Sequence, residues 1–190
     1  MDEITDNKGE YSSDPVSRAA HGGIVIALAI ALGYALAAVP NIELVTISLA
    51  LGGYILGGGW GAIAGGLGFG LYSILSPYGV APPPVLLAQI MGGVIIGFGG
   101  YLLKAGFQRF EKRRIRIGLS ATIGFIITFS YDLLTNIGSF IIVSSESTFI
   151  PFIIGGLGFA VIHMLSNCLI FGILFVPLTS VIEKVTSHRF

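Results

Sequence analysis

The feature that most constrains this chain is the position of its basic residues between long apolar stretches. The 190 residues contain six apolar stretches, and all ten Lys and Arg residues lie outside them. Only 11% of the residues are charged, whereas soluble domains carry about 25%. Such a chain lacks the polar surface that a water-soluble fold requires. The sequence therefore predicts an all-α, polytopic membrane protein with six transmembrane helices in one bundle.

Charges and turn residues mark the ends of the apolar stretches. A spanning helix needs about 20 residues, so the second and third stretches are predicted to be tilted, broken or incompletely spanning. The stretches are continuously apolar rather than alternating, which argues against a β-barrel. We expect a polar cytoplasmic tail over 1–18, a membrane domain over 19–182 and a cytoplasmic tail over 183–190. The predicted spans are 21–39, 42–57, 62–75, 85–103, 117–143 and 151–176.

The basic residues also predict the orientation. They fall in the N-terminal tail, in 104–116 and in the C-terminal tail, and six spans place these three segments on one side. The positive-inside rule assigns that side, with both termini, to the cytoplasm. The loops on the other side contain no Lys or Arg and carry Glu43 and Glu146.

Composition and motifs exclude several classes of protein. Ten basic and ten acidic residues cancel, which argues against nucleic-acid binding. A single cysteine, Cys168, excludes a disulfide framework and a cysteine-based metal site. The sequence has neither a P-loop nor a G-x-S-x-G elbow. We therefore expect no enzymatic activity, no cofactor and no metal site in this chain.

Polar residues within the apolar stretches are the candidates for a binding site. Asp132 is the only acid deep inside a span, roughly 22 Å from the cytoplasmic end of its helix. Asn136 lies one turn further on, and His163 and Asn167 repeat this spacing in the last span. Because polar groups in lipid are costly, these side chains are expected to face a pocket open to the outside. The candidate substrate-binding residues are Glu43, Tyr78, Gln89, Tyr131, Asp132, Asn136, His163 and Asn167.

A structural interpretation of the same residues stays open. Asn and Gln often form hydrogen bonds between membrane helices, so Gln89 and Asn167 fit either role. His163 fits a core histidine with satisfied partners as well as a ligand contact. Glu43 lies at the interface, where water can solvate it. Asp132 favours function, because no Lys or Arg in any span can neutralise it.

A stripe of small residues runs along the first span. Ala27, Ala31 and Ala35 follow small-xxx-small spacing, which permits close contact between helices. From the pattern alone, the stripe fits packing within the bundle better than docking onto another membrane protein.

Together these residues resemble the substrate-binding S components of energy-coupling factor (ECF) vitamin transporters. The resemblance covers nearly the whole chain after the tail, including the six-span plan. The matching strings are PNIELVT at 40–46, GAIAG at 61–65, LSPYG at 75–79, PPP at 82–84, LAQ at 87–89 and YDLLTN at 131–136.

The resemblance implies a mechanism and a set of partners. Such a protein sits in the prokaryotic plasma membrane and captures a small nutrient from outside, near the outer surface. It associates with a transmembrane coupling subunit and two cytoplasmic ATPases, and it is thought to topple in the membrane. The alanine stripe on the first helix touches the coupling subunit, which makes Ala27, Ala31 and Ala35 docking residues. ATP hydrolysis belongs to the partners.

Two other classes of function remain open. Rod-shape-determining membrane scaffolds have a similar size and number of spans, bind protein partners and do not need an outward pocket with a buried acid. The chain could also be a small stand-alone channel or carrier. The charges expected near the outer pocket are all acidic, so we expect a neutral or cationic nutrient rather than a polyanion.

Overall fold

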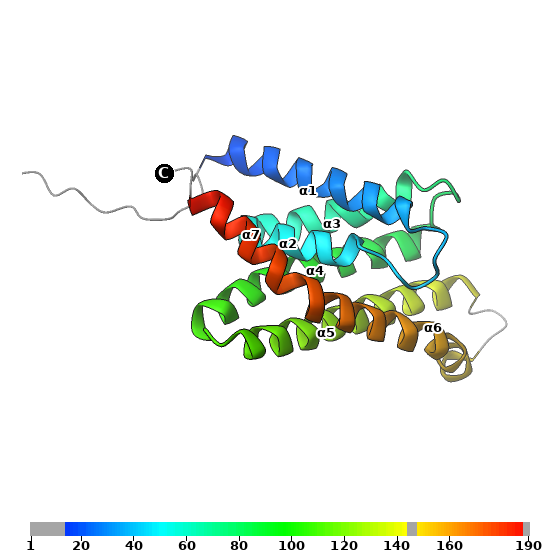
Figure 1. Ribbon diagram of the computed structural model, residues 1–190. Coiled ribbons are helices and arrows are strands. Elements are labelled where there is room, and N and C mark those ends of the chain that lie inside the picture. The colour runs from blue at the N-terminus through cyan, green and yellow to red at the C-terminus, as the bar shows by residue number, and fades with distance from the viewer. Residues whose placement is uncertain (1–13, 144–147, 188–190) are drawn as a thin grey trace, which may run out of the picture.

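The computed structural model describes residues 14–143 and 148–187, and within these ranges the chain is helical without a strand (Figure 1). The predicted all-α class is confirmed. Helices α6, η1 and α7 follow one another without a break, and η1 is a π-helical segment. The elements are α1 (Pro15–Ala35), α2 (Val45–Leu56), α3 (Gly58–Ile74), α4 (Pro83–Arg109), α5 (Arg113–Val143), α6 (Phe149–Ile170), η1 (Phe171–Phe175) and α7 (Val176–Ser187).

Four helical segments of the described chain are long and apolar enough to cross a membrane. Their outer faces expose large apolar side chains such as Ile150 and Leu169, which suits contact with lipid. At 12 and 17 residues, α2 and α3 extend roughly 18 and 26 Å against a hydrocarbon core of about 30 Å. That all six predicted spans cross the membrane therefore stays a prediction. The four segments are Pro15–Ala35, Pro83–Arg109, Arg113–Val143 and Phe149–Val185.

The basic segments gather at one end of the molecule. The start of α1, the α4–α5 connection and α7 lie together there, and the α1–α2 and α3–α4 connections lie at the opposite end (Figure 1). We call the first of these the basic end. We call the second the acidic end, because its α1–α2 connection carries Glu43. Lys8, Glu146 and Arg189 lie outside the described residues. That the basic end faces the cytoplasm stays a prediction.

Arg116 joins the end of α4 to the start of α5 at the basic end. Its guanidinium donates hydrogen bonds to the carbonyl oxygens of Phe110 and Phe107, each at 2.8 Å. These carbonyls belong to the last turn of α4, where no further turn supplies N–H donors. Arg116 also lies over the Phe107 ring, 5.1 Å from its centroid. The side chain therefore closes α4 and holds the start of α5 against it.

Glycines bring the backbones of α2, α3 and α4 into contact. A Cβ added at Gly65 would overlap the carbonyl of Gly93, and one added at Gly93 would overlap the carbonyl of Gly65. A Cβ at Gly97 would overlap the carbonyl of Gly61, and a Cβ at Gly61 would lie 2.5 Å from the Cα of Gly53. Any side chain here would separate the helices, so the three helices form one closely packed unit.

A single glycine turns the chain between α2 and α3. Gly57 has φ 88°, a conformation that residues with a side chain rarely adopt. The next helix begins at Gly58, four residues before the predicted start at 62. One residue in this conformation suffices for the turn.

The sixth span was predicted to end at 176, but the helix continues past this position and past Pro177. That prediction is wrong, because α7 extends to Ser187. Proline cannot donate to the carbonyl four residues earlier, and its ring crowds that carbonyl. The π-helical turn Phe171–Phe175 ends two residues before Pro177, and its wider backbone accommodates the missing hydrogen bond.

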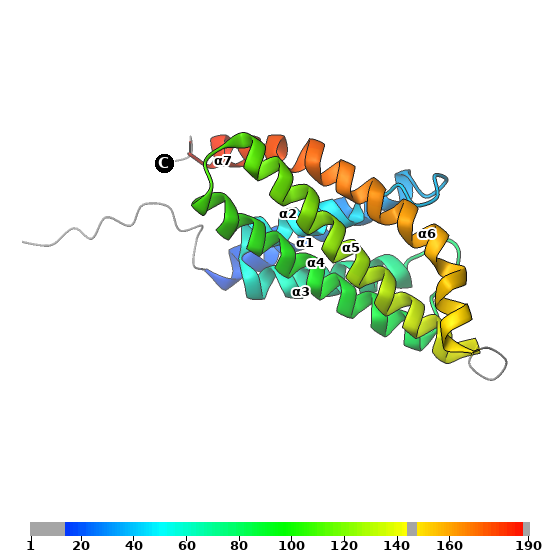
Figure 2. The same cartoon turned by 90° about the horizontal axis from the view of Figure 1, so that it is seen from below.

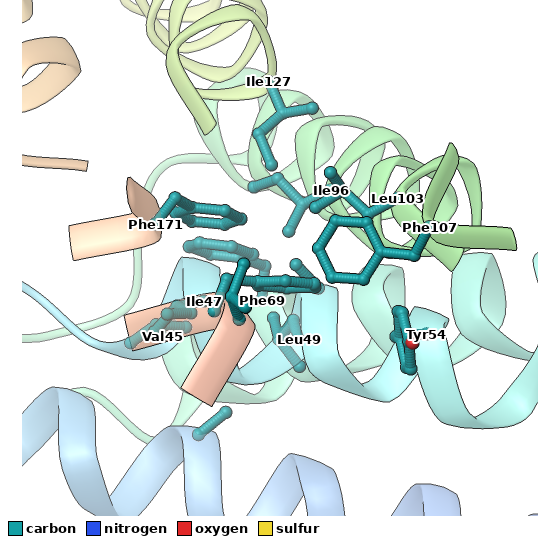
Figure 3. Packing of buried hydrophobic residues seen from close by; sticks show 14 residues of the cluster. Val45, Ile47, Leu49, Tyr54, Phe69, Ile96, Leu103, Phe107, Ile127 and Phe171 are labelled. Atoms are coloured by element: carbon teal, nitrogen blue, oxygen red, sulfur yellow. The ribbon is translucent and has the colours of Figure 1, made fainter. Parts of the chain in front are cut away.

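The core lies where η1 packs against the closely packed unit. Phe171 and Phe175 are fully buried with their rings stacked 5.5 Å apart. Phe171 fits against Gly124 of α5, where a Cβ would approach the ring to 2.6 Å. Figure 2 shows α5 lying between α4 and the final helix. Figure 3 shows core side chains from α2, α3, α4, α5 and η1 meeting, among them Ile47, Leu49, Phe69, Ile96, Leu103, Phe107, Ile127 and Phe171.

We predict that Gly97→Ala destabilises the protein, because the new methyl group would overlap the backbone of α3 at Gly61. Overpacking of this kind costs about 1–3 kcal/mol. Gly118→Ala in α5 is the matched control, since a Cβ there meets nothing within 4 Å. Thermal unfolding in nanodiscs should show a lower Tm for Gly97→Ala and an unchanged or higher Tm for Gly118→Ala. Equal Tm values for the two variants would contradict the backbone contact.

Candidate functional site

Four of the predicted polar residues meet around the imidazole of His163. Its Nδ1 lies 2.8 Å from Oδ1 of Asp132, and its Nε2 lies 3.5 Å from Oε1 of Glu43. The side-chain amide of Asn167, one turn along α6, donates to the same oxygen of Glu43 at 3.2 Å. We call Glu43, Asp132, His163 and Asn167 the His163 cluster. It joins the α1–α2 connection to α5 and α6.

Glu43 has a different partner on each carboxylate oxygen. Oε2 accepts a hydrogen bond from the backbone N–H of Thr46 at 2.8 Å, which satisfies a free donor at the start of α2. Leu44, the N-cap residue, has no side-chain group for this task. Oε1 faces His163 and Asn167. Glu43 therefore ties the start of α2 to α6, rather than being merely solvated as the structural alternative allowed.

Asp132 projects from α5 and is largely buried, with 13% of its side chain exposed. Its Oδ1 faces His163, while its Oδ2 is buried without a hydrogen-bond partner in the described structure. This arrangement leaves one oxygen of the carboxylate available to another donor.

Asn136 lies beside the cluster but turns back onto its own helix. Its side-chain amide donates to the backbone carbonyl of Asp132 at 2.9 Å. Its Oδ1 lies against Gly156 of α6, where a Cβ would approach it to 2.7 Å. The i, i+4 spacing correctly predicted that the two residues share a helix face. It could not predict that Asn136 would bond the backbone there instead of joining the polar network.

Tyr131 and Gln89 form the side of the site that belongs to α4 and α5. The Tyr131 ring packs over Gly92 of α4 and lies 4.6 Å from the Phe69 ring and 6.3 Å from the His163 ring. The Gln89 side chain interacts with Tyr131. Its Oε1 is buried without a hydrogen-bond partner in the described structure.

Sequence reasoning missed the aromatic residues of α1 and α3 that continue this contact. Tyr72 packs edge-on against Phe69 at 6.3 Å and stacks on Tyr34 at 4.9 Å. The Tyr34 hydroxyl donates to the Tyr72 carbonyl at 2.7 Å. Phe69 and Tyr72 are three residues apart, so they share a face of α3. That spacing was the available signal, but an aromatic pair in an apolar helix does not indicate a polar site.

Tyr78 is not part of the cluster. It lies in the connection between α3 and α4 and is 80% exposed. Its backbone N–H bonds the Ser76 hydroxyl at 3.2 Å, which fixes the turn. Within the described residues, no hydrogen bond or ring contact joins its side chain to the site.

A small cavity adjoins the cluster between α5 and α6. It encloses about 50 Å³, which is space for one or two water molecules. Apolar side chains form most of its wall, so a ligand larger than water would require the helices to separate here. Its lining includes Phe129, Asp132, Leu133, Asn136, Ala160 and Met164.

The alanine stripe of α1 faces away from the bundle. Ala27, Ala31 and Ala35 are exposed, whereas Ala29 and Gly33 are buried against the other helices. A Cβ at Gly33 would overlap Val45 and crowd Tyr72. Packing within the bundle therefore uses the other face of α1, and the stripe is left open.

The cluster is rich in hydrogen-bond acceptors. It combines two carboxylates, an imidazole and one side-chain amide, and its oxygens without partners, on Asp132 and Asn167, are acceptors. Within the described ranges, no group of three or more His, Cys, Asp or Glu side chains is arranged to hold a metal ion. Comparisons with protein-family models, curated proteins and solved structures give no match.

A double-mutant cycle will test whether the Asp132–His163 pair stabilises the fold. We expect Asp132→Asn and His163→Gln to couple by about 1–3 kcal/mol in the free energy of unfolding, because their side chains are in direct contact. Asn136→Ala with His163→Gln is the control cycle, since the Asn136 amide bonds the Asp132 backbone. Coupling in the control cycle as large as in the test cycle would contradict the assignment.

Proposed function

We propose that this protein is the substrate-capture subunit of an ECF-type importer in a prokaryotic plasma membrane. It binds a small vitamin-like nutrient near the acidic end of the bundle and delivers it together with a transmembrane coupling subunit and two ATPases. The basic end faces the cytoplasm in this proposal.

The observation that carries the proposal is the His163 cluster, together with the buried, unpartnered oxygens of Asp132, Asn167 and the neighbouring Gln89. Unpaired polar atoms inside a membrane bundle are costly, and a structural network would satisfy them. Three such atoms, on Gln89, Asp132 and Asn167, come from three helices and all lack a partner in the described structure. They support a site that is completed by a ligand.

The open face of α1 supports the second half of the proposal. Small residues at four-residue spacing allow another helix to approach closely. Because Ala27, Ala31 and Ala35 point away from the bundle, a partner can reach them without disturbing the cluster. Capture and docking thus use separate surfaces.

Affinity purification of the tagged chain from its native membrane tests the whole proposal. We expect a membrane coupling subunit and two ATPases to copurify, and mass spectrometry to detect a bound small molecule. Partners of a cell-shape machinery without a small molecule would favour the scaffold instead. A bound molecule without ATPases would favour a stand-alone carrier.

The docking surface can be tested by paired substitutions in α1. We predict that Ala31→Trp prevents assembly with the coupling subunit but leaves ligand binding intact, because Ala31 is exposed and α1 contributes no residue to the cluster. Ala29→Trp is the contrasting variant, since Ala29 is fully buried and an indole there should lower the Tm. Normal assembly by Ala31→Trp would remove the stripe from the proposal.

A further inference from the structure

Three acceptor oxygens on α4, α5 and α6 define what a ligand must supply. Oδ2 of Asp132, Oε1 of Gln89 and Oδ1 of Asn167 are buried and lack hydrogen-bond partners in the described structure. Each is an acceptor, and Asn167 is fully buried. Because the Asn167 amide nitrogen already donates to Glu43, its oxygen is the atom left unpaired. The site therefore needs hydrogen-bond donors.

The charge of the site favours a cationic ligand. Two carboxylates lie on opposite sides of one imidazole. The described Lys and Arg residues belong to the first turn of α1, the α4–α5 region and α7, at the other end of the molecule (Figure 1). With His163 protonated, two negative charges face one positive charge. One additional positive charge would balance the site.

His163 itself shows the geometry that the site accepts. One ring nitrogen faces each carboxylate, and an imidazole can donate from both nitrogens only as a cation. The elements around the site therefore already bracket a flat, cationic group with N–H donors on two sides. The Tyr131 ring, 6.3 Å from His163, adds an aromatic face that attracts cations.

We infer that the ligand is a cation carrying at least two N–H donors, such as an amidinium or a protonated amino-heterocycle, which pairs with Glu43 and Asp132 and donates to the free oxygens of Gln89 and Asn167. This inference rests on the proposed function for the identity of the site as the capture site. Since the adjoining cavity has space only for water, binding requires α6 to move away from α5.

Three probes of matched size and shape test the inference: benzamidinium, benzamide and benzoate. They share a phenyl ring and differ in charge and in the number of N–H donors. We measure the Tm of the full-length protein in nanodiscs at increasing concentrations of each probe. Benzamidinium should raise the Tm, whereas benzamide should act weakly and benzoate not at all. A benzamidinium shift no larger than that of benzamide or benzoate overturns the inference.

Substitutions of matched shape then locate the binding. Glu43→Gln and Asp132→Asn each remove one negative charge, and each should weaken benzamidinium binding roughly tenfold or more. Ser130→Ala is the control on α5, because the Ser130 hydroxyl bonds the Ile126 carbonyl of its own helix. Unchanged binding by both charge-removing variants overturns the inference. Should these variants not fold, the order of the three probes on the unmodified protein still decides.

The proposed importer function and the proposed ligand class can be contradicted independently. If the chain copurifies with a coupling subunit and ATPases but prefers benzoate, the function stands and the ligand class is wrong. If benzamidinium binds through Glu43 and Asp132 but no ATPase copurifies, the site stands and the importer assignment is wrong.

Discussion

The contact of one imidazole with two carboxylates sets the arrangement of the acidic end. Asp132 and Glu43 are largely buried, and the helices and connections that carry the described Lys and Arg residues gather at the other end of the molecule (Figure 1). A buried carboxylate without a partner is strongly destabilising, so both depend on His163. Because Glu43 also bonds the start of α2, the same contact connects α6 to the closely packed unit. The position of α6 relative to α2 and α5 is therefore set by electrostatics as well as by apolar packing.

The molecule combines two kinds of helix contact with different mechanical properties. Helices α2, α3 and α4 meet backbone to backbone at glycines, and such contacts leave no side chain that could change rotamer. Near the cluster, α5 and α6 meet through polar side chains and around a small cavity. A ligand can displace side chains and water there without separating the closely packed helices. The site thus lies at the edge of the closely packed unit.

The sequence was sufficient for the helical class because lipid permits few alternatives for uninterrupted apolar stretches. It also singled out Glu43, Asp132, His163 and Asn167 as candidates, since polar residues stand out in such stretches, and the structure brings these four together. It did not identify the aromatic contacts of Phe69 and Tyr72, because aromatic residues in an apolar helix are unexceptional. The helix beyond Pro177 was missed because a π-turn leaves no signal in hydropathy. The inward turn of Asn136 depends on Gly156, a tertiary neighbour that spacing along one helix cannot reveal.

The reciprocal glycine contacts restrict how this sequence can change over evolutionary time. In most cores, a larger residue on one helix can be compensated by a smaller one on its neighbour. Gly65 faces Gly93, and Gly61 faces Gly97, so both partners already have the smallest possible side chain. An enlargement on either helix has no compensating change across the contact. Covariation among homologues would therefore not reveal these pairs, although they are among the closest contacts in the bundle.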